Sequence, residues 1–383
     1  MLTILRPSFF RSTSTAQSSP WRKRARFALV ALAGLASFVA IANARDAHAQ
    51  TDAPEDTTKI VPGPWDFGAT LGANLAQSAF SRNWAGGDQG SFVWVARADL
   101  SAERQFNMSF NWANTLQLAY GQTANQVNDP NNPDENVWEP PDKTTDLIQL
   151  ESVGRFTLQR WVDPYVAFRL ESQFLDKTDP RGNLHFNPLR LKESAGIARV
   201  FEKTEQREFI TRVGIAFRQN IGRTFVGGFD PITMEPLRGV DIDTETSVGN
   251  DGGFEWQTDM RWPILEDKVI YKGQLLAYAP VLYSQSDELE DFDRYALAID
   301  PAREEIAGFW QYPDVNFQNG FTTQITKVVS VDLYLQWIYN RFDEATQVPT
   351  PEEMPALLLV DRGVRKAGQF KQVLSIALSY TLF

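Results

Sequence analysis

Residues Ser91 to Tyr120 read SFVWVARADLSAERQFNMSFNWANTLQLAY, and this stretch decides the fold. Apolar side chains fall on every second position of its first arm, at Phe92, Trp94, Ala96, Ala98 and Leu100. After a polar break at residues 103–105, the alternation resumes over residues 106–120. A period of two is typical of β-strands, because successive side chains point to opposite faces. Each arm is long enough to cross a bilayer, which takes about 9–11 tilted residues. The stretch therefore predicts a membrane-spanning hairpin with its turn at the break.

The same unit recurs along the chain and predicts an all-β, antiparallel up-and-down transmembrane β-barrel of about twelve strands. The expected strands centre on residues 65–76, 92–100, 106–120, 146–158, 166–174, 189–201, 209–217, 252–262, 269–283, 315–325, 331–339 and 374–382. Long segments follow the odd-numbered strands and short ones follow the even-numbered strands. Outer-membrane barrels have long external loops and short periplasmic turns, so this sorting predicts that both termini are periplasmic.

A soluble β-barrel would show the same alternation, with its apolar face inside. Three features favour the membrane alternative: an export signal, the two classes of connecting segment, and aromatic residues near the strand ends. Aromatic residues at those positions are typical of the girdles at the two membrane interfaces.

The first 49 residues have the layout of a cleavable signal peptide. Basic residues at 22–26 precede an apolar run at 27–42, and Ala47-His48-Ala49 matches a small-x-small cleavage site. An uncleaved inner-membrane anchor is the alternative. Residues 50–63 are polar and Pro-containing, which predicts a disordered periplasmic leader. The barrel is then expected over residues 64–383.

The expected strand at 189–201 has the poorest alternation. Glu193 and Arg199 share a face with Leu189, Leu191 and Ala195. A β-bulge or a different register in this strand would account for the irregularity.

Charge narrows the range of partners. The formal net charge is −11, and residues 1–49 hold seven of the 37 basic residues but one of the 48 acidic ones, so residues 50–383 carry −17. This balance argues against a nucleic-acid partner. It is typical of acidic, solvated external loops.

Three short motifs near the start of the barrel resemble a known family. They are Trp65-Asp66-Phe67-Gly68, Asn74-Leu75-Ala76-Gln77 and Asn83-Trp84-Ala85-Gly86-Gly87. Over residues 64–120 the chain resembles domain of unknown function 3078, found among outer-membrane proteins of Bacteroidota-type bacteria. The resemblance implies a β-barrel and an outer-membrane location. It implies no activity, because the family has no established catalytic or binding residues.

The C-terminal residue, Phe383, resembles the terminal aromatic by which barrel-assembly machinery recognises outer-membrane proteins. Its fit is imperfect, because Phe383 lies on the face opposite Leu374 and Leu382. The assembly machinery and outer-membrane lipid are the expected partners, together with a small solute.

Candidate catalytic and metal-binding residues are few. A nucleophilic serine needs a nearby base, usually His, and outside the signal peptide only His185 remains, in a connecting segment. We therefore expect no enzyme activity and keep an outer-membrane lipid hydrolase as a remote alternative. Two segments carry oxygen ligands of the kind that calcium prefers, although neither has a known motif spacing, and we expect no metal and no cofactor. These residues are Asp129, Asn131, Asn132 and Asp134 in one segment, and Asp287, Glu288, Glu290, Asp291 and Asp293 in the other.

Charged residues on the polar face of the strands are the most informative candidates. Charges are costly against lipid, so we expect them to line the lumen. They are Arg97, Asp99, Glu151, Arg155, Arg169, Glu171, Arg212, Arg218, Glu255, Asp259, Arg261, Lys272 and Asp332, and Arg190, Lys192 and Lys371 are candidates near the rims.

Two interpretations of this lumen remain open. The charges could pair across strands and fill the interior, or they could line a narrow, weakly anion-preferring passage. Eight strands leave a filled interior and sixteen leave an aqueous channel, and twelve falls between. The sequence therefore supports a narrow pore for a small solute, with a preference for anions. The alternative is a non-conducting structural or surface-interaction barrel that acts through its external loops.

Overall fold

The computed structural model describes residues 62–78, 90–129, 132–158, 160–179, 181–204, 206–228, 241–343, 363–365 and 367–381. The predicted signal peptide and most of the predicted leader lie outside these residues. The strands are β1 (Asp66–Ser78), β2 (Ser91–Asn107), β3 (Phe110–Asp129), β4 (Asn132–Trp138), β5 (Asp142–Arg155), β6 (Asp163–Ser172), β7 (Leu189–Lys203), β8 (Glu208–Val226), β9 (Asp243–Ile264), β10 (Val269–Tyr283), β11 (Asp314–Gln324), β12 (Val329–Tyr339) and β13 (Gln369–Thr381). Two short helices lie between β10 and β11, namely α2 (Ser286–Ile299) and the 3₁₀ helix η1 (Phe309–Gln311).

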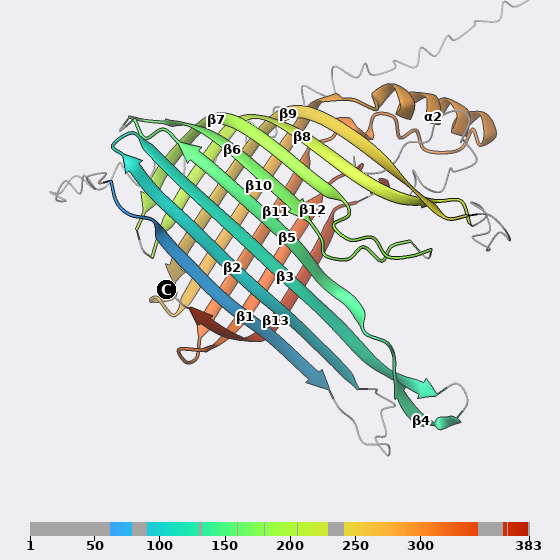
Figure 1. Cartoon of the computed structure of the whole chain (residues 1–383), viewed down its shortest axis with the longest axis horizontal. Helices are drawn as coiled ribbons and strands as arrows, with labels where there is room; N and C mark the ends of the chain where they lie inside the picture. The colour runs from blue at the N-terminus through green and yellow to red at the C-terminus, as the bar shows by residue number, and fades with distance from the viewer. Residues whose placement is uncertain are drawn as a thin grey trace, which may run out of the picture. The chain divides into compact units, whose positions relative to one another are not determined.

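Twelve of these strands close into an antiparallel barrel (Figure 1). Each strand pairs with its neighbours in sequence, and β1 also pairs with β13, which closes the ring. The remaining strand, β4, pairs with β3 and lies outside the ring. The predicted twelve-stranded up-and-down barrel is confirmed.

The outer surface is apolar and the inner surface is polar. Ile215 and Phe254 are each 62% exposed, whereas Arg212 is 7% exposed and Gln257 is 1% exposed. In a soluble barrel this distribution would be reversed, because water would meet the polar face. Alternation along each strand places the two kinds of side chain on opposite faces. This barrel therefore presents its apolar side chains outward.

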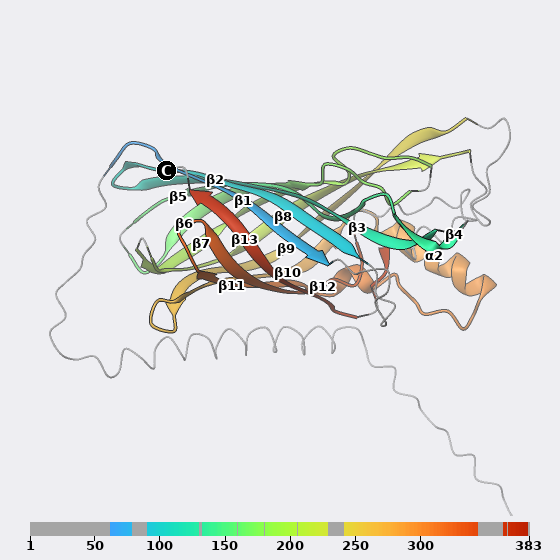
Figure 2. The same cartoon turned by 90° about the horizontal axis from the view of Figure 1, so that it is seen from below.

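Aromatic side chains gather where short turns connect the strands, at the end called here the short-turn end. Trp65 lies 5.7 Å from Phe106 and 5.9 Å from Trp112 between ring centroids. Arginines accompany them on the outer surface: the guanidinium of Arg199 lies 5.0 Å from the ring of Trp161. The opposite end, called the long-loop end, carries β4, α2 and the extended ends of β8 and β9 (Figure 2).

The first turn differs from the prediction. It falls at residues 108–109, and Glu103, Arg104 and Gln105 remain in β2, paired with β3. Glu103 accepts a hydrogen bond from Asn111 Nδ2 at 2.9 Å, and the Arg104 guanidinium lies over the ring of Phe106. The side chains of Glu103 and Arg104 therefore have partners on β3 and on β2 itself, and these residues continue the strand instead of breaking it.

Three of the predicted loops contain regular structure. Residues 121–144 include the end of β3 and all of β4, and the connection expected between the strands at 209–217 and 252–262 contains the ends of β8 and β9. Residues 284–313 form α2 and η1, where Leu289, Phe292 and Ala296 are buried at helical spacing. No helix in the described part of the chain is long and apolar enough to span a membrane.

The irregularity predicted for the strand at 189–201 is present in β7 as a register shift between Val200 and Glu202. It lies beyond Glu193 and Arg199, so it does not turn either side chain inward. Glu193 pairs with Phe168 and Phe217 where both ladders are regular. The bulge therefore does not explain the charge that prompted its prediction.

Candidate functional site

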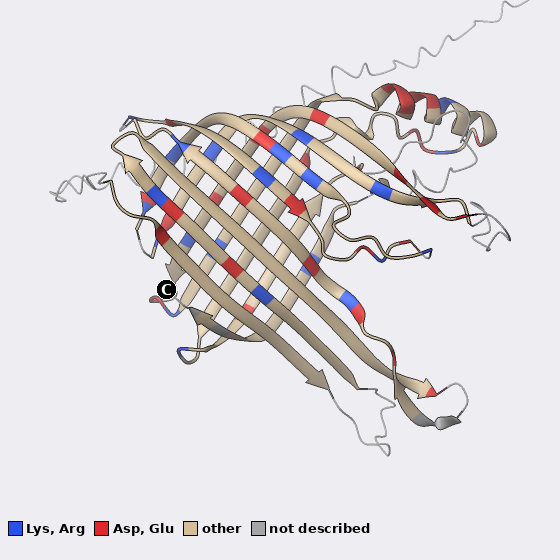
Figure 3. Ribbon diagram, viewed as in Figure 1, with Lys and Arg blue, Asp and Glu red and all other residues tan. Residues whose placement is uncertain are grey.

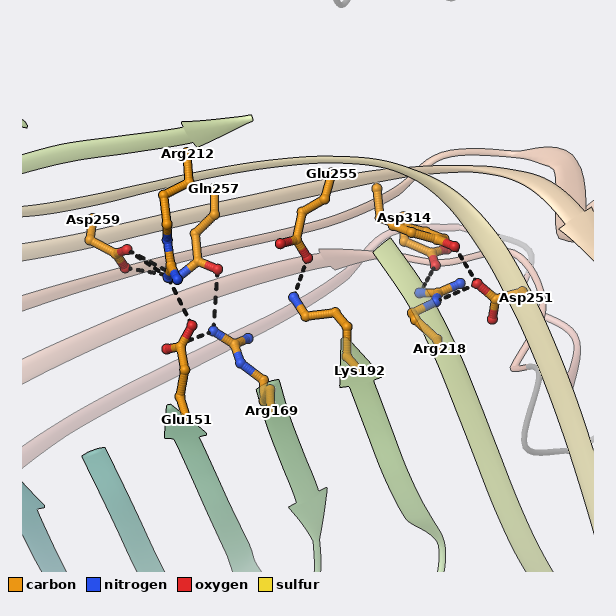
Figure 4. A network of polar contacts seen from close by, with 11 residues as sticks. Glu151, Arg169, Lys192, Arg212, Arg218, Asp251, Glu255, Gln257, Asp259 and Asp314 are labelled. Carbon is orange, nitrogen blue, oxygen red and sulfur yellow. Dashed lines mark hydrogen bonds and ion pairs between the residues drawn. The ribbon is translucent and has the colours of Figure 1, made fainter. Parts of the chain in front are cut away.

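Charged side chains from strands that are not neighbours meet inside the barrel. Glu151 on β5 accepts hydrogen bonds from Arg169 Nη2 on β6 at 3.2 Å and from Arg212 Nη2 on β8 at 2.8 Å. Two strands separate β5 from β8, so this contact can form only across the concave inner face of the wall. Figure 4 shows the three side chains converging from different strands.

The network continues to β9. Arg169 Nη2 donates to Gln257 Oε1 at 3.3 Å, and Gln257 Nε2 donates to Asp259 Oδ2 at 3.0 Å. Asp259 also lies 3.5 Å from Arg212 Nη2. Lys192 on β7 forms an ion pair with Glu255 on β9. These six charged residues, three of each sign, and the amide of Gln257 are named here the inner network.

A second cluster lies beside the inner network and links β8 to β11. Arg218 donates to Asp251 at 2.7 Å from Nε and to Asp314 at 2.7 Å from Nη1. The hydroxyl of Tyr278 donates to Asp251 Oδ1 at 2.5 Å, and the Arg218 guanidinium lies over the Tyr278 ring. One cation therefore holds carboxylates from two strands against the inner wall.

The inner network fills its side of the barrel. Arg169, Arg212, Glu255 and Gln257 are each less than 9% exposed. Each buried charge here has an opposite charge within hydrogen-bond or ion-pair distance, as burial requires. Their charges cancel, so this part of the interior, along β5 to β9, is a neutral polar core.

The opposite side of the interior, from β10 through β13 to β2, is more open and carries cations that have no ion-pair partner among the described residues. Lys272 and Lys371 are exposed, and Arg97 is half-buried. Arg97 lies close enough to Lys371 and to Tyr334 to act on both electrostatically. Within the described residues, neither Arg97 nor Lys371 forms a hydrogen bond or an ion pair. Figure 3 shows that basic and acidic positions are otherwise interspersed along the strands.

A salt bridge crosses the mouth at the long-loop end. Arg190 Nη2 lies 3.0 Å from both carboxylate oxygens of Asp343. Arg190 belongs to β7 and Asp343 follows β12, which lies five strands away in the ring of twelve. Glu171 approaches the same arginine at 4.0 Å, as Arg365 approaches Asp343. The pair spans most of the barrel's width at this end.

The structure brings some of the predicted lumen residues together and separates others. Six converge on the inner network and the Arg218 cluster: Glu151, Arg169, Arg212, Arg218, Glu255 and Asp259. Arg155 instead lies 3.9 Å from Asp163 at the short-turn end, and Glu171 lies at the opposite mouth. Arg97, Asp99, Arg261, Lys272 and Asp332 lie outside both clusters; Asp332 accepts a hydrogen bond from Ser330 at 3.3 Å.

Sequence reasoning missed several members of these clusters, namely Asp251, Gln257, Tyr278 and Asp314, and the mouth residue Asp343. A signal for one of them was present, because Asp251 has the same parity as Glu255 and Asp259. The predicted strand began one residue too late to include it. Gln257 and Tyr278 have uncharged side chains, so the pattern of charges along the strands does not indicate them.

The residues considered for catalysis and for metal binding do not form a site in the described part of the chain. His185 Nδ1 lies 3.1 Å from the carbonyl oxygen of Phe174. The acidic residues at 287–293 lie on α2, and Asp293 is buried there. The other candidate segment contains β4 and is only partly described. No group of three or more His, Cys, Asp or Glu residues among those described could hold a metal ion.

Comparisons with solved structures return barrels at low similarity. The translocator domain of the autotransporter NalP from Neisseria meningitidis aligns over 91% of this chain and 97% of its own, with 8% identity and a TM-score of 0.33. An outer membrane channel from Pseudomonas putida F1 aligns over 86% and 99%, with 11% identity and a TM-score of 0.36. The β domain of the Bordetella autotransporter BrkA aligns over 82% and 98%, with 10% identity and a TM-score of 0.30. Similarity at this level carries no information on function.

No protein of curated function matches the sequence. A family model does match, described as a protein of unknown function (DUF3078), over residues 75–177. This range covers the end of β1 and the strands β2 to β6. Over these residues the chain is similar to the DUF3078 family of proteins of unknown function, as the resemblance in its sequence indicated.

Proposed function

We propose that this protein is an outer-membrane barrel that passes a small anionic solute through a narrow route along the wall formed by β10 to β13, β1 and β2. The apolar outer surface supports the membrane location, since Ile215 and Phe254 would otherwise face water. In this proposal, outer-membrane lipid surrounds that surface. Both termini would then lie in the periplasm, and the C-terminal strand ending at Phe383 would meet the barrel-assembly machinery.

The observation that carries the proposal is the pair of cations Arg97 and Lys371. Elsewhere in the interior, buried cations are paired with carboxylates, as Arg212 is with Glu151. Two like charges without a carboxylate partner repel each other, and an anion between them would relieve that repulsion. A passing anion therefore has a favourable but replaceable place to stop, which is what conduction requires.

Asp99 limits the strength of this preference. It lies two residues from Arg97 on the same face of β2, and its carboxylate offsets part of the positive field. The exposed Lys272, nearer the short-turn end, adds positive charge along the same wall. We therefore expect a moderate selectivity for anions over cations rather than exclusion of cations.

The test is single-channel recording from the refolded chain without residues 1–49, in a planar bilayer under a salt gradient. We expect discrete steps in the current and a reversal potential displaced toward the equilibrium potential of the anion. The double variant Arg97→Gln, Lys371→Gln should move that potential toward zero, while Lys268→Gln on an exposed turn should leave it unchanged. Unchanged selectivity in the double variant would remove the anion site. Silence from a protein shown to be folded and inserted would remove the pore.

A non-conducting barrel is the second candidate, and one observation favours it. Between β10 and β11, α2 and η1 pack with Tyr283 and Phe342 into a small apolar core, in which Leu289 and Phe292 are fully buried. Such an ordered structure at the long-loop end suits recognition of an external partner. A folded, inserted and silent protein would leave this function in place. For lipid hydrolysis, the remote alternative, lipid turnover that is unchanged in His185→Ala would end the hypothesis.

A further inference from the structure

Glu193 on β7 points away from the barrel interior. The flanking positions Ser194 and Ala198 are buried, whereas Glu193, Ala195 and Ile197 are exposed. Its cross-strand partners are Phe168 on β6 and Phe217 on β8. Glu193 therefore occupies the lipid-facing surface between two aromatic side chains.

A carboxylate in this position is costly and has no internal compensation. Charged side chains on the lipid face of a barrel destabilise it by an amount that grows with depth. In the part of the chain that the structure describes, Glu193 forms no hydrogen bond and no ion pair. An ionisable residue exposed to lipid indicates a functional site, with its charge partner to be identified.

A groove in the outer wall surrounds this carboxylate. Its volume is about 950 Å³, at the upper end of the range for small-molecule sites. Small residues in the lining, among them Gly154, Ala195 and Gly252, lower the floor, and larger side chains such as Trp112 and Phe254 stand along it. The hydroxyl of Ser152, another polar group in the groove, already accepts a hydrogen bond from Trp112 Nε1 at 2.8 Å. Glu193 is thus the charged residue among those that line the groove, and its carboxylate has no partner within the described residues.

A second copy of the chain cannot readily supply the matching cation. Outward-facing arginines such as Arg199 and Arg207 lie at the short-turn end, packed on Trp161 and Trp262. Arg199 is six residues from Glu193 on one strand, about 20 Å along it and roughly 15 Å in depth for a tilt of about 40°. Two copies in one membrane share their depth, so these charges would not meet.

We propose that the groove binds a hydrophobic amine dissolved in the membrane. Its ammonium group would pair with the Glu193 carboxylate and contact the rings of Phe168 and Phe217, which attract cations through their faces. Its apolar body would lie in the groove over Gly154, Ala195 and Gly252. The inference rests on the proposed membrane location and is independent of conduction.

The experiment measures binding of hexadecylamine to the refolded protein in phosphatidylcholine vesicles, with hexadecanol as a probe of equal chain length. A photoreactive diazirine on each chain and mass spectrometry of the cross-linked peptides report where each probe lies. We expect the amine, but not the alcohol, to label the peptides around Glu193. Glu193→Gln should weaken amine binding about tenfold, the scale of a charge-assisted contact. Glu266→Gln, which alters an exposed turn, is the matched control.

Each alternative outcome has a definite meaning. Equal labelling by amine and alcohol in the native protein would overturn the proposal, even if the Glu193 variant failed to fold. Unchanged amine binding by a folded Glu193→Gln variant would do the same. Displacement of the amine by phosphatidylethanolamine would assign the groove to a membrane lipid in place of a free amine. Conductance of the same samples is a separate measurement, so a protein that binds the amine but does not conduct would leave this inference standing.

Discussion

Arg212 is the residue that ties most of the inner network together. It contacts Glu151 and Asp259, which lie on opposite sides of it in the strand order. Removing one partner of a buried pair leaves an uncompensated charge and typically costs about 3–5 kcal/mol. Glu151 would keep Arg169, so we expect Arg212→Gln to lower the free energy of unfolding by about 3 kcal/mol. Urea unfolding in vesicles, followed by tryptophan fluorescence, would measure it.

The matched control is Arg261→Gln, which also neutralises an arginine on the inner face of the barrel, in this case on β9. Among the described residues the Arg261 side chain has no hydrogen bond or ion pair, so its loss should change stability by less than about 0.5 kcal/mol. Equal losses in the two variants would mean that net charge, and not the specific contacts of Arg212, governs stability.

Residue-level pairing was the part of the candidate site that the sequence could not supply. Alternation assigns Glu151 and Arg212 to the polar face, but their contact spans two intervening strands. The stagger of the strands around the ring determines which residues meet across a barrel. Alternation within one strand gives no information on that stagger. For Glu193, by contrast, alternation alone places the side chain on the outer, apolar face. The bulge predicted for this strand would have turned it inward, and the structure has no bulge at Glu193.

At the scale of elements, α2 is held to the chain that follows it by a buried acid. Asp293 Oδ2 accepts hydrogen bonds from the backbone N–H groups of Ile306, at 2.7 Å, and Ala307. Burial raises the pKa of Asp293 above its ordinary value, although these two hydrogen bonds act in the opposite direction. The folded loop therefore holds a proton on this carboxyl at a pH where the unfolded loop releases it.

The sign of the pH dependence follows from that difference. Between the ordinary pKa of Asp, near 3.8, and its raised value in the fold, the folded loop binds more protons than the unfolded one. The stability of the loop should therefore fall as the pH rises through this window. Asp293→Asn keeps an acceptor oxygen and carries no charge, so its stability should not vary there. Hydrogen exchange of the α2 amides at pH 4 to 7 would measure both; a parallel dependence in the variant would exclude Asp293 as the cause.

The same helix marks the limit of reading elements from the sequence. Strands of the barrel wall are recognisable from the sequence, because one of their faces is apolar and the other is polar. Beyond the apolar outer surface both faces of a strand meet water, so the ends of β3, β8 and β9 carry no alternation and their sequence predicts loops. In α2 the spacing of Leu289, Phe292 and Ala296 is helical. The acidic residues between them nevertheless favour a solvated connecting segment when the sequence is considered alone.

At the scale of the whole molecule, the barrel interior has two unlike sides. The inner network makes the wall from β5 to β9 a neutral, closely packed layer, and the wall from β10 to β2 leaves cations exposed. A ring of twelve strands is wide enough for both, since eight strands already enclose a filled interior. A filled lumen and a passage, which the sequence left as competing interpretations, can therefore coexist side by side in one barrel.

The salt bridge between Arg190 and Asp343 crosses the end of the proposed passage and should restrict it. The side chains of both residues are partly exposed, at 40% and 28%, and ion pairs open to solvent contribute about 0–1 kcal/mol. The bridge is thus weak enough to open on its own, as a gate would be. Asp343→Asn would remove its attraction and shift the mouth toward the open arrangement, at most about fivefold in population on that energy scale.

Planar-bilayer recording would show this shift as a larger open fraction or a larger unitary conductance in Asp343→Asn than in the native protein. High salt should raise the open fraction of the native protein and leave the variant nearly unchanged, because ions screen exposed pairs. Glu304→Gln is the control, since Glu304 pairs with Arg341 at 3.2 Å near the same loops without crossing the mouth. If the control variant opened the channel as far as Asp343→Asn does, loop charge in general would set the conductance. If neither variant changed it, the narrowest point would lie deeper, beside Arg97 and Lys371.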